Sequence, residues 1–487
     1  MKRPPAASDD PERWEIVTSL AARVGLGLAV AGYVAVLVPW VLRQHYGFST
    51  FGFDLGIFDQ GVWLLSRFEE PFVTVRGLNL FGDHTSFILL LLVPFYWLAP
   101  SASVLLIAQT AALAGAVLPV WFIARDRLRD ENLALAAAIA YLAHPAVALT
   151  NLENFHPDSF EIPLVFGVLF FMMHRRWVGY TICLIGLLLV KEDVPLMTFV
   201  LGLYVAVRYD RKVGLLTSVG SLMWLGATLF LIFPALNGSG TLYGSRIGGA
   251  FGGTAGLLKT ALLRPWDVLA VAFGPDKPWY LWQMGAPLAG MFLLSPGLAA
   301  VALLPLLSNL LSSFPYQHQI EFHYGTLIVP VLVTAAIFGI ARLRSPAART
   351  NAVIVMTASA LVSGYLWGPV GRAPRGLADP SSERAVAIRE AIALIPEDAA
   401  VSAAFFTVPH LTHREHIYEF PVPWRAQNWG DNSSNGARLS QTDLIDYVLV
   451  EYPMAPEMQE IVDSLDAEGF SEAFRSDGML LLQREGR

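Results

Sequence analysis

This sequence has little charge and almost no cysteine. Only 15% of its 487 residues are charged, whereas soluble domains carry about 25%, and 54% are hydrophobic. Cys183 is the single cysteine, which excludes an internal disulfide and argues against redox chemistry. The formal net charge of −7 argues against a nucleic-acid partner. Together with a mean hydropathy of +0.50, these features indicate a polytopic membrane protein.

The sequence also lacks the short motifs of several enzyme classes. It contains no Walker motif, no Rossmann fingerprint, no nucleophile elbow and no His-Glu-x-x-His pattern. Their absence argues against nucleotide-driven chemistry and against zinc-protease chemistry.

Long apolar runs follow a polar N-terminal tail at residues 1–15, which we expect in the cytoplasm. A spanning helix needs roughly 20 mainly apolar residues, and the first run is too long for a cleavable signal, so we predict a retained signal-anchor. The run from Tyr280 to Ser312 is too long for one helix, and the turn signal Ser295-Pro296-Gly297 divides it into two antiparallel spans. With these two we predict about eleven transmembrane helices, the other nine at residues 16–42, 103–124, 132–150, 159–174, 177–190, 194–208, 213–234, 325–341 and 351–367.

Basic residues in the short loops predict which way the chain crosses the membrane. Cytoplasmic loops of membrane proteins carry an excess of Lys and Arg, and with the division at Ser295 all the basic groups fall on one side. Without that division, the group at Arg342 would lie outside. We therefore predict a multi-pass protein of the cytoplasmic (inner) membrane with a cytoplasmic N-terminus and an extracytoplasmic C-terminal domain. The basic groups are Lys2, Arg3 and Arg13; Arg125, Arg127 and Arg129; Arg175 and Arg176; Arg208, Arg211 and Lys212; and Arg342, Arg344 and Arg349.

The chain divides into a membrane domain and a smaller C-terminal domain. Residues 16–368 form the predicted transmembrane domain, with a large first external loop at 43–101. In that loop the apolar segment Ser86–Leu98 is too short to span, so we expect it at the membrane interface. Residues 369–380 are a linker rich in Pro, Gly and Arg, and residues 381–487 are predicted to form a small α/β domain. Its helices and strands are expected at Glu383–Leu394, Ala399–Phe405, Tyr447–Glu451, Met458–Leu465 and Met479–Gln483.

The predicted external loops concentrate acidic, imidazole and amide side chains, whereas the predicted cytoplasmic loops hold mostly arginines. A catalytic cavity at one membrane face needs such groups, so we expect segments far apart in the sequence to bring them into one pocket that opens outwards. The candidate residues are Asp54, Asp59, Asp83, His84, His156, Asp158, Glu161, Lys191, Glu192, Asp193, Arg246, His318, Glu321 and His323.

The sequence leaves other roles open for the acidic candidates. Asp54 or Asp83 would also serve as a helix N-cap, since an aspartate there accepts hydrogen bonds from the first turn. Asp54 and Asp59 are five residues apart, and on one regular helix they would point about 140° apart, so they cannot both be catalytic from such a helix. Asp158 and Glu161 equally fit the first turn of a helix.

The basic and glycine-rich candidates also allow two interpretations each. Lys191-Glu192-Asp193 is either a solvated turn or a phosphate contact with local charge compensation. The glycine-rich stretch Asn237–Gly256, which contains Arg246, is either a loop that orders over substrate or a flexible linker. Two sets of residues carry metal-ligating atoms without matching a fixed zinc or calcium motif, so structural roles are as consistent with them as ligation. These sets are His318, Glu321 and His323; and Asp83, His84, His156 and Asp158.

Four motifs in this order resemble a known family. They are Phe53-Asp54-Leu55-Gly56-Ile57-Phe58-Asp59-Gln60, Phe81-Gly82-Asp83-His84, Asn154-Phe155-His156-Pro157-Asp158 and Lys191-Glu192-Asp193. Over about residues 40–345 the chain resembles a family of uncharacterised polytopic bacterial membrane proteins that is grouped with the GT-C superfamily of integral-membrane glycosyltransferases. The predicted fold class is therefore an all-α, GT-C-like polytopic membrane protein with a small C-terminal extracytoplasmic α/β domain.

The resemblance also implies a chemistry. GT-C enzymes take a sugar from a polyprenyl-phosphate carrier at the outer membrane face, with an acidic residue of the first external loop as general base and sometimes a divalent metal. By resemblance the base is Asp54; since this chain lacks the adjacent acidic pair common in that superfamily, Asp59 is the second choice. A Mg or Mn ion is implied as an optional cofactor. The expected donor-phosphate contacts are Lys191 and Arg246, with Glu192 and Asp193 beside them.

We therefore predict a membrane glycosyltransferase that moves a sugar from a polyprenyl-phosphate carrier to a glycan, lipid or protein acceptor of the cell envelope. The alternatives are a transporter or flippase for a lipid-linked or ionic substrate, and a scaffold that presents the C-terminal domain. That domain is expected to bind acceptor glycan or only to cap the site. Its aromatic and polar side chains Trp424, Asn428, Trp429 and Asp431 suit a sugar but equally suit an ordinary core and surface.

Overall fold

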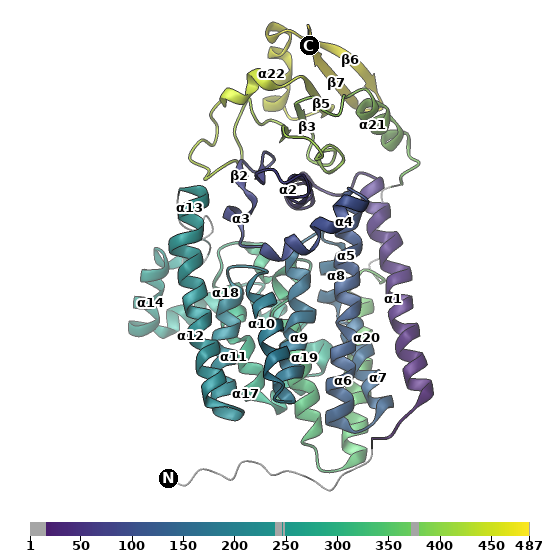
Figure 1. Cartoon of the computed structure of the whole chain (residues 1–487), viewed down its shortest axis with the longest axis vertical. Helices are drawn as coiled ribbons and strands as arrows, with labels where there is room; N and C mark the ends of the chain where they lie inside the picture. The colour runs from purple at the N-terminus through teal and green to yellow at the C-terminus, as the bar shows by residue number, and fades with distance from the viewer. Residues whose placement is uncertain (1–15, 239–245, 247–248, 372–378, 487) are drawn as a thin grey trace.

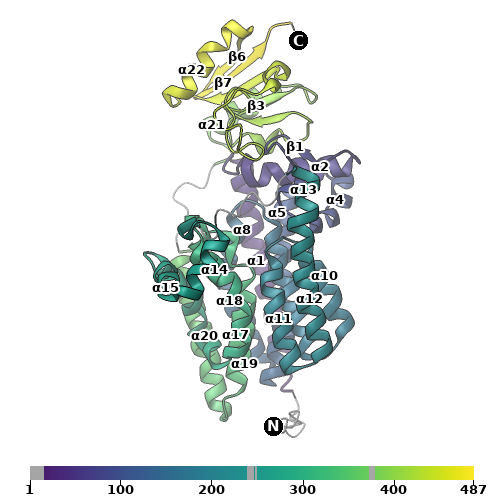
Figure 2. The same ribbon diagram turned by 90° about the vertical axis from the view of Figure 1, so that its left-hand side faces the viewer.

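The computed structural model describes residues 16–238, 246, 249–371 and 379–486. The N-terminal tail, nine residues of the glycine-rich stretch (239–245 and 247–248) and most of the predicted linker lie outside the described residues. A helical bundle carries the α/β domain at one end, and α1 begins at the opposite end (Figure 1). The layer between bundle and domain is the loop at residues 43–101, which the sequence predicts to be external (Figures 1 and 2).

Most of the bundle consists of apolar helices close to the predicted spans. Five helices among the described residues are long and apolar enough to cross a membrane, or six if the pair α7 and α8, bent by 47°, counts as one span. Other predicted spans are helices of 10–17 residues, so the number eleven is not confirmed. The helices are α1 (Leu20–Tyr46), α5 (Ala102–Gly115), α6 (Val117–Leu128), α7 (Glu131–Leu142), α8 (Pro145–Leu152), α9 (Glu161–Met173), α10 (Trp177–Leu188), α11 (Val194–Arg208), α12 (Arg211–Ala227), α13 (Phe233–Asn237), α16 (Lys277–Gly285), α17 (Pro296–Ala299), α18 (Leu303–Leu311), α19 (Ile328–Ala341) and α20 (Pro346–Trp367).

The chain reverses near Ser295, as the turn signal predicts. Asn309 donates a hydrogen bond to the hydroxyl of Tyr280 at 2.9 Å, which pairs the start of α16 with the end of α18. The first limb is not one helix, however: α16 ends at Gly285, and Ala289 and Gly290 take φ values of 49° and 67°. The reversal places the Leu294 carbonyl against Arg342, whose guanidinium donates to it at 2.9 Å.

The basic turns lie together at the end of the bundle opposite the α/β domain. Val17 pairs with Asp130 in a short parallel bridge, and Arg175 donates to the Tyr209 carbonyl at 3.0 Å. The Arg127 guanidinium stacks over the ring of Phe338 at 3.9 Å. The described basic turns therefore lie at one end of the bundle, and the side of the membrane that they face stays a prediction. Lys2, Arg3 and Arg13 lie outside the described residues.

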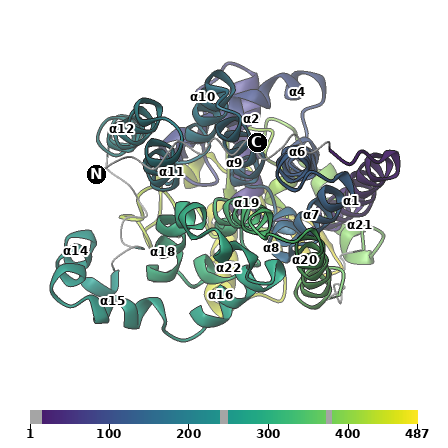
Figure 3. The same ribbon diagram turned by 90° about the horizontal axis from the view of Figure 1, so that it is seen from below.

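Two helices that the sequence did not predict project from the rim of the bundle (Figure 3). They are α14 (Thr254–Leu263) and α15 (Pro265–Ala272). Both expose large apolar side chains, with Leu262 84% and Trp266 63% exposed. Such a surface suits contact with lipid rather than water.

The first external loop folds into short elements rather than one interfacial helix. These are a five-residue π-helical segment (Gly52–Gly56), α2 (Ile57–Ser66), β1 (Phe72–Val73), β2 (Leu78–Asn79), α3 (Leu80–Asp83), a 3₁₀ segment (Phe87–Leu91) and α4 (Val93–Leu98). Within the predicted interfacial segment, Leu89 and Tyr96 are buried whereas Leu91 and Leu98 are exposed. The segment is therefore two-sided, as an interfacial element requires.

The C-terminal domain is a five-stranded sheet with the order β4-β3-β5-β7-β6. Strand β3 runs parallel to both neighbours, and β7 runs antiparallel to β5 and β6. Both predicted helices and three predicted strands are confirmed, whereas β4 and β6 were missed: β4 has only three residues, and most of β6 is exposed. The elements are α21 (Glu383–Ala393), β3 (Val401–Ala403), β4 (Ile417–Glu419), β5 (Tyr447–Glu451), α22 (Pro456–Ser464), β6 (Phe470–Ser476) and β7 (Met479–Arg484).

The C-terminal domain and the first external loop share one hydrophobic core. Leu55 and Phe58 of the loop belong to the same cluster of buried side chains as Val408, Leu449 and Leu481 of the domain. Because apolar burial is a main source of folding energy, the domain stabilises the loop conformation.

Candidate active site

Asp54 lies in an unusual backbone conformation at the junction between bundle and domain. Its φ of 93° and ψ of −92° interrupt the segment before α2. Non-glycine residues rarely adopt a positive φ, and such strain is concentrated at functional sites. The N-cap of α2 is Gly56, so Asp54 does not cap that helix. Its side chain keeps 34% of its surface exposed, with Oδ1 3.4 Å from His156 Nε2.

Two histidines and a glutamate stand behind Asp54. The rings of His156 and His323 stack with their centroids 3.8 Å apart. His156 Nδ1 lies 3.0 Å from the Glu153 carbonyl and therefore donates to it, which turns Nε2 towards Asp54. The backbone N–H of His323 donates to Glu153 Oε2 at 2.7 Å, and His323 Nδ1 lies 3.1 Å from the same oxygen.

The charge balance of this group favours a positive His156. Burial alone would lower the pKa of His156, but the carboxylates of Glu153 and Asp54 outweigh burial and raise it to about 9. Burial raises the pKa of Glu153, and His156 opposes this shift. These neighbours therefore favour the imidazolium form of His156, whose Nε2 lies towards Asp54.

Lys191 is buried in an ion pair and is not part of a solvated turn. Its ammonium donates to Asp158 Oδ1 at 2.8 Å, and the same oxygen lies 3.8 Å from His323 Nε2. Burial would raise the pKa of Asp158, but Lys191, His323 and His156 outweigh it and lower the pKa. The pair fixes the connection between α10 and α11 against His323.

The neighbouring Glu192 ties the same connection to the first external loop. Its carboxylate accepts from His84 Nδ1 at 2.8 Å and from the backbone N–H of Thr85 at 3.4 Å. Burial would raise the pKa of Glu192, but the charge of His84 and the hydrogen bond from it outweigh burial and lower the pKa. Residues from four distant parts of the chain thus meet in one cluster, which we call the acid–histidine cluster: Asp54, His84, Glu153, His156, Asp158, Lys191, Glu192 and His323.

Other predicted candidates lie at the edge of this cluster. Asp193 and Glu161 line, with Asp158, a cavity of about 10 Å³ beneath it, and Glu161 accepts from the Thr326 hydroxyl at 2.7 Å. The Arg246 guanidinium stacks on Phe314 at 4.1 Å.

Three predicted candidates have different surroundings. The guanidinium of the buried Arg76 lies 3.7 Å from Asp83, and Asp83 ends α3 rather than capping a helix. His318 lies near Asp276 and Lys277. Glu321 is half-buried in the connection before His323.

Asp59 is held in the interface with the C-terminal domain. It is 1% exposed, and its carboxylate accepts from the hydroxyls of Tyr96 and Thr412. His413 Nε2 lies 3.2 Å from it. This environment occupies both oxygens with protein groups, which suits a structural role.

We expect Asp59→Ala to lower the free energy of unfolding by about 3 kcal/mol, because two buried hydroxyls lose a charged acceptor. The thermal midpoint of the detergent-purified protein measures this change. Asp463→Ala on the exposed face of α22 is the matched control. Loss of transfer at an unchanged midpoint would instead place Asp59 in the chemistry.

Hydrogen bonds to main-chain carbonyls connect the C-terminal domain to the first loop. Gly52 N–H donates to the Phe405 carbonyl at 2.7 Å. Arg76 donates to the carbonyl of Gly430 at 2.8 Å, and the indole of Trp429 donates to that of Thr74 at 3.1 Å. Trp429 therefore packs on the first loop, and Trp424 belongs to the core of the domain. These contacts agree with the interpretation of both side chains as ordinary core and surface aromatics.

Sequence reasoning missed two acidic residues of the site region. Glu153 directly precedes the Asn154-Phe155-His156 motif, and that position was the available signal. Glu419 ends β4, near Asp54. Nothing in the local sequence separates Glu419 from other domain carboxylates, because only the docking of the domain brings it there.

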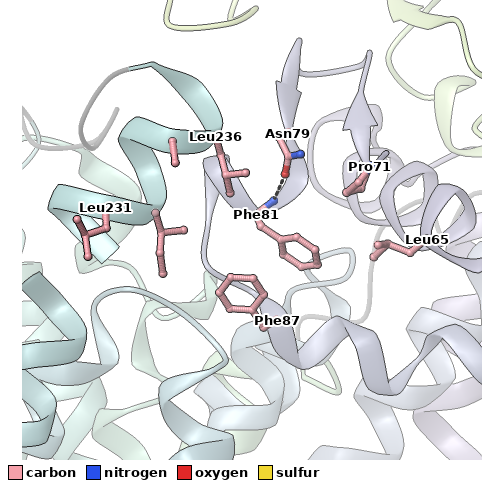
Figure 4. Close-up of a pocket in the computed structure, with 9 residues that line it drawn as sticks. Leu65, Pro71, Asn79, Phe81, Phe87, Leu231 and Leu236 are labelled. Atoms are coloured by element: carbon pink, nitrogen blue, oxygen red, sulfur yellow. Dashed lines mark hydrogen bonds between the residues drawn. The ribbon is translucent and has the colours of Figure 1, made fainter. Parts of the chain in front are cut away.

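An open apolar groove of about 460 Å³ lies between the first loop and the α12–α13 end (Figure 4). The rings of Phe81 and Phe87 stack at 4.7 Å between centroids and form its floor. Its walls are Leu65, Pro71, Asn79, Leu231, Ile232, Ala235 and Leu236. An apolar groove at this level suits an alkyl or prenyl chain.

Comparison with known proteins agrees with this description. The model of the family DUF2079, described as a predicted membrane protein, matches residues 44–468. No curated protein matches. Among solved structures, ArnT from Cupriavidus metallidurans bound to undecaprenyl phosphate is similar, with a TM-score of 0.53 and 14% identity over 95% of this chain and 98% of that chain. The apo ArnT structure matches with a TM-score of 0.42 and 15% identity over the same shares. The match to the structure with undecaprenyl phosphate shows the fold.

Proposed function

Because this chain belongs to the DUF2079 family of predicted membrane proteins and has the fold of ArnT, we propose that it is a membrane glycosyltransferase. It moves a sugar from a polyprenyl-phosphate carrier to an acceptor of the cell envelope, at the outer face of the cytoplasmic membrane. The observation that carries the proposal is Asp54: a partly exposed carboxylate in a strained turn, backed by the buried acid–histidine cluster. Strained backbone and converging ionisable groups are typical of catalytic sites.

Asp54 acts as the general base. The acceptor hydroxyl gives its proton to the Asp54 carboxylate while its oxygen bonds to the anomeric carbon. The bond between that carbon and the carrier phosphate breaks, and the phosphate leaves with the electron pair. A single displacement of this kind inverts the anomeric centre. His156, whose Nε2 lies 3.4 Å from Asp54 Oδ1, orients the carboxylate.

Positive side chains stabilise the leaving phosphate. Arg246 and Lys191 are the candidates, with Glu192 and Asp193 setting the local charge balance. Lys191 is paired with Asp158 at 2.8 Å, so its proposed role is to hold the cluster in place, and Arg246 is the candidate for direct contact with the phosphate. Cationic groups that are already positioned where negative charge develops lower the activation barrier of the transfer in a partly water-excluded site.

The prenyl chain of the donor lies in the apolar groove of Figure 4. The groove is lined almost wholly by apolar side chains and joins the first loop, which contains Asp54, to the bundle. The ArnT structure of the same fold was determined with undecaprenyl phosphate, which supports a carrier of this class.

The cluster also contains a donor set for a divalent metal. Glu153, His156 and His323 bring one ligand atom each within 4.8 Å of one another. Two imidazoles and a carboxylate suit Mn or Zn better than Mg, which prefers oxygen ligands. A metal bound there would take the place of the Nε2 proton of His156, because an imidazolium cannot ligate a metal, and it would supply positive charge for the departing phosphate.

We expect the purified protein to retain Mn or Zn, and His156→Ala or His323→Ala to lower the bound metal at least tenfold. Inductively coupled plasma mass spectrometry of protein dialysed against a weak chelator measures this. His318→Ala, outside the donor set, is the control and should keep the wild-type content. Wild-type protein without metal would show that the histidines act only through hydrogen bonds.

The proposed function is tested by mass spectrometry of envelope glycans and lipid-linked sugars in a strain that lacks the protein. We expect one sugar to disappear from an envelope acceptor while its polyprenyl-phosphate donor accumulates, and the wild-type gene to reverse both. A flippase would also leave the acceptor without sugar, but purified protein in vesicles would then move the donor across the bilayer without transferring its sugar. An unchanged envelope would contradict both functions.

A further inference from the structure

The carboxyl ends of the parallel strands in the C-terminal domain are turned towards the Asp54 segment. Strand β3 has β4 on one side and β5 on the other, both parallel to it. Open sheets bind ligands at the carboxyl edge where the strand order switches in this way. Here the first loop reaches that edge: Gly52 N–H donates to the carbonyl of Phe405, two residues after β3 ends.

Glu419 stands at the same edge, as the last residue of β4. Its Oε2 is buried and has no hydrogen-bond partner within the described parts of the chain. A Cβ added to Gly52 would lie 2.9 Å from Oε2, so the loop approaches this carboxyl group closely. Burial and the charge of Asp54 raise the pKa of Glu419 to about 7, although a hydrogen bond from the backbone N–H of Phe53 to its carboxyl group opposes this shift. The domain thus places a second carboxyl group beside Asp54.

A buried hydrogen-bond acceptor without a donor lowers the stability of the fold unless a ligand donates a hydrogen bond to it. Asp54 and Glu419 approach the junction from opposite sides, since Asp54 belongs to the first loop and Glu419 to the domain. The apolar groove is lined by the first loop and the α12–α13 end alone. The donor chain therefore lies away from Glu419, and the domain side is left for the acceptor.

We propose that Glu419 is an acceptor-binding residue, whose unpartnered oxygen accepts a hydrogen bond from a hydroxyl of the acceptor. This inference rests on the proposed function. It makes the C-terminal domain part of the active site: one carboxylate removes the proton of the attacking hydroxyl, and the other holds a neighbouring hydroxyl. The acceptor is therefore a polyol or glycan with at least two nearby hydroxyl groups.

The test measures initial transfer rates with protein reconstituted in vesicles that contain the polyprenyl-phosphate sugars of the deletion strain. The acceptor probe is the delipidated envelope-glycan fraction of that strain, varied in concentration. We expect Glu419→Ala to raise the KM for this fraction about 10- to 100-fold, as for loss of a hydrogen bond to a charged group, with a smaller fall in kcat. Glu419→Gln, which keeps one carbonyl oxygen, should recover part of the affinity.

Controls separate the outcomes. Glu415 is an exposed residue four positions before Glu419, and Glu415→Ala should keep the wild-type KM. Every variant at position 419 should bind undecaprenyl phosphate as the wild type does. The thermal midpoint of each variant shows whether it is folded. If Asp54→Asn abolishes transfer but both Glu419 variants keep the wild-type KM, this inference is wrong and the proposed function stands. If Asp54→Asn transfers like the wild type, the assignment of Asp54 as the base is wrong, whereas a wild-type protein that transfers no sugar would make the proposed function wrong.

Discussion

Asp54→Asn should lower the transfer rate by about 10²- to 10⁴-fold, the usual contribution of a general base. The amide cannot take the acceptor proton, yet it has nearly the shape of the carboxylate. Asparagine also tolerates a positive φ better than most residues, so the turn at φ 93° should survive. The variant should therefore fold normally while losing activity.

Initial rates in vesicles and the envelope glycans of a complemented strain measure this change. The matched control is Asp463→Asn, an exposed aspartate of the same chain far from the site, which should transfer at the wild-type rate. A wild-type rate for Asp54→Asn would remove the base from the mechanism. A rate lost together with the thermal midpoint would point to misfolding, and Asp54→Glu would then be tested for partial activity.

Lys191→Met should lower the free energy of unfolding by about 3–5 kcal/mol, the usual cost of breaking a buried ion pair on one side. Asp158 would keep its negative charge in a buried position without the ammonium that now lies 2.8 Å away. This loss of unfolding free energy is expected to be larger than the loss caused by the same substitution at any exposed lysine. The transfer rate should also fall, because Asp158 lies 3.8 Å from His323 and holds it in the cluster.

A double-mutant cycle isolates the pair. Lys191→Met with Asp158→Asn should recover part of the lost stability, since the uncompensated charge is gone. Lys212→Met, on an exposed lysine at the other end of the bundle, should leave the thermal midpoint unchanged. Equal midpoints for Lys191→Met and the wild type would mean that Lys191 is solvated after all.

Patterns that act within one segment could be predicted from the sequence. The apolar runs predict most helices of the bundle, and the turn at Ser295 follows from Pro296 and Gly297. The family resemblance carried by the four motifs is confirmed by the match to residues 44–468. Asp54, His156 and Lys191 were selected as ionisable residues of the predicted external loops, and the structure brings all three into one cluster.

The features that the sequence did not predict depend on contacts between segments far apart in the sequence. The number of spans is not confirmed, since several apolar helices are short or bent and composition alone does not show how they pair. The sequence treats Asp59 and Asp54 alike, but Asp59 meets Thr412 and His413 only after the domain docks. Glu419 is missed for the same reason.

The core shared by residues near both ends of the chain also constrains how the protein is made. Synthesis runs from the N-terminus, and domains generally fold as units in that order. Asp54 is translated before the strands whose side chains share a core with its segment. The proposed active site is therefore complete only after these strands have folded and packed against the first loop.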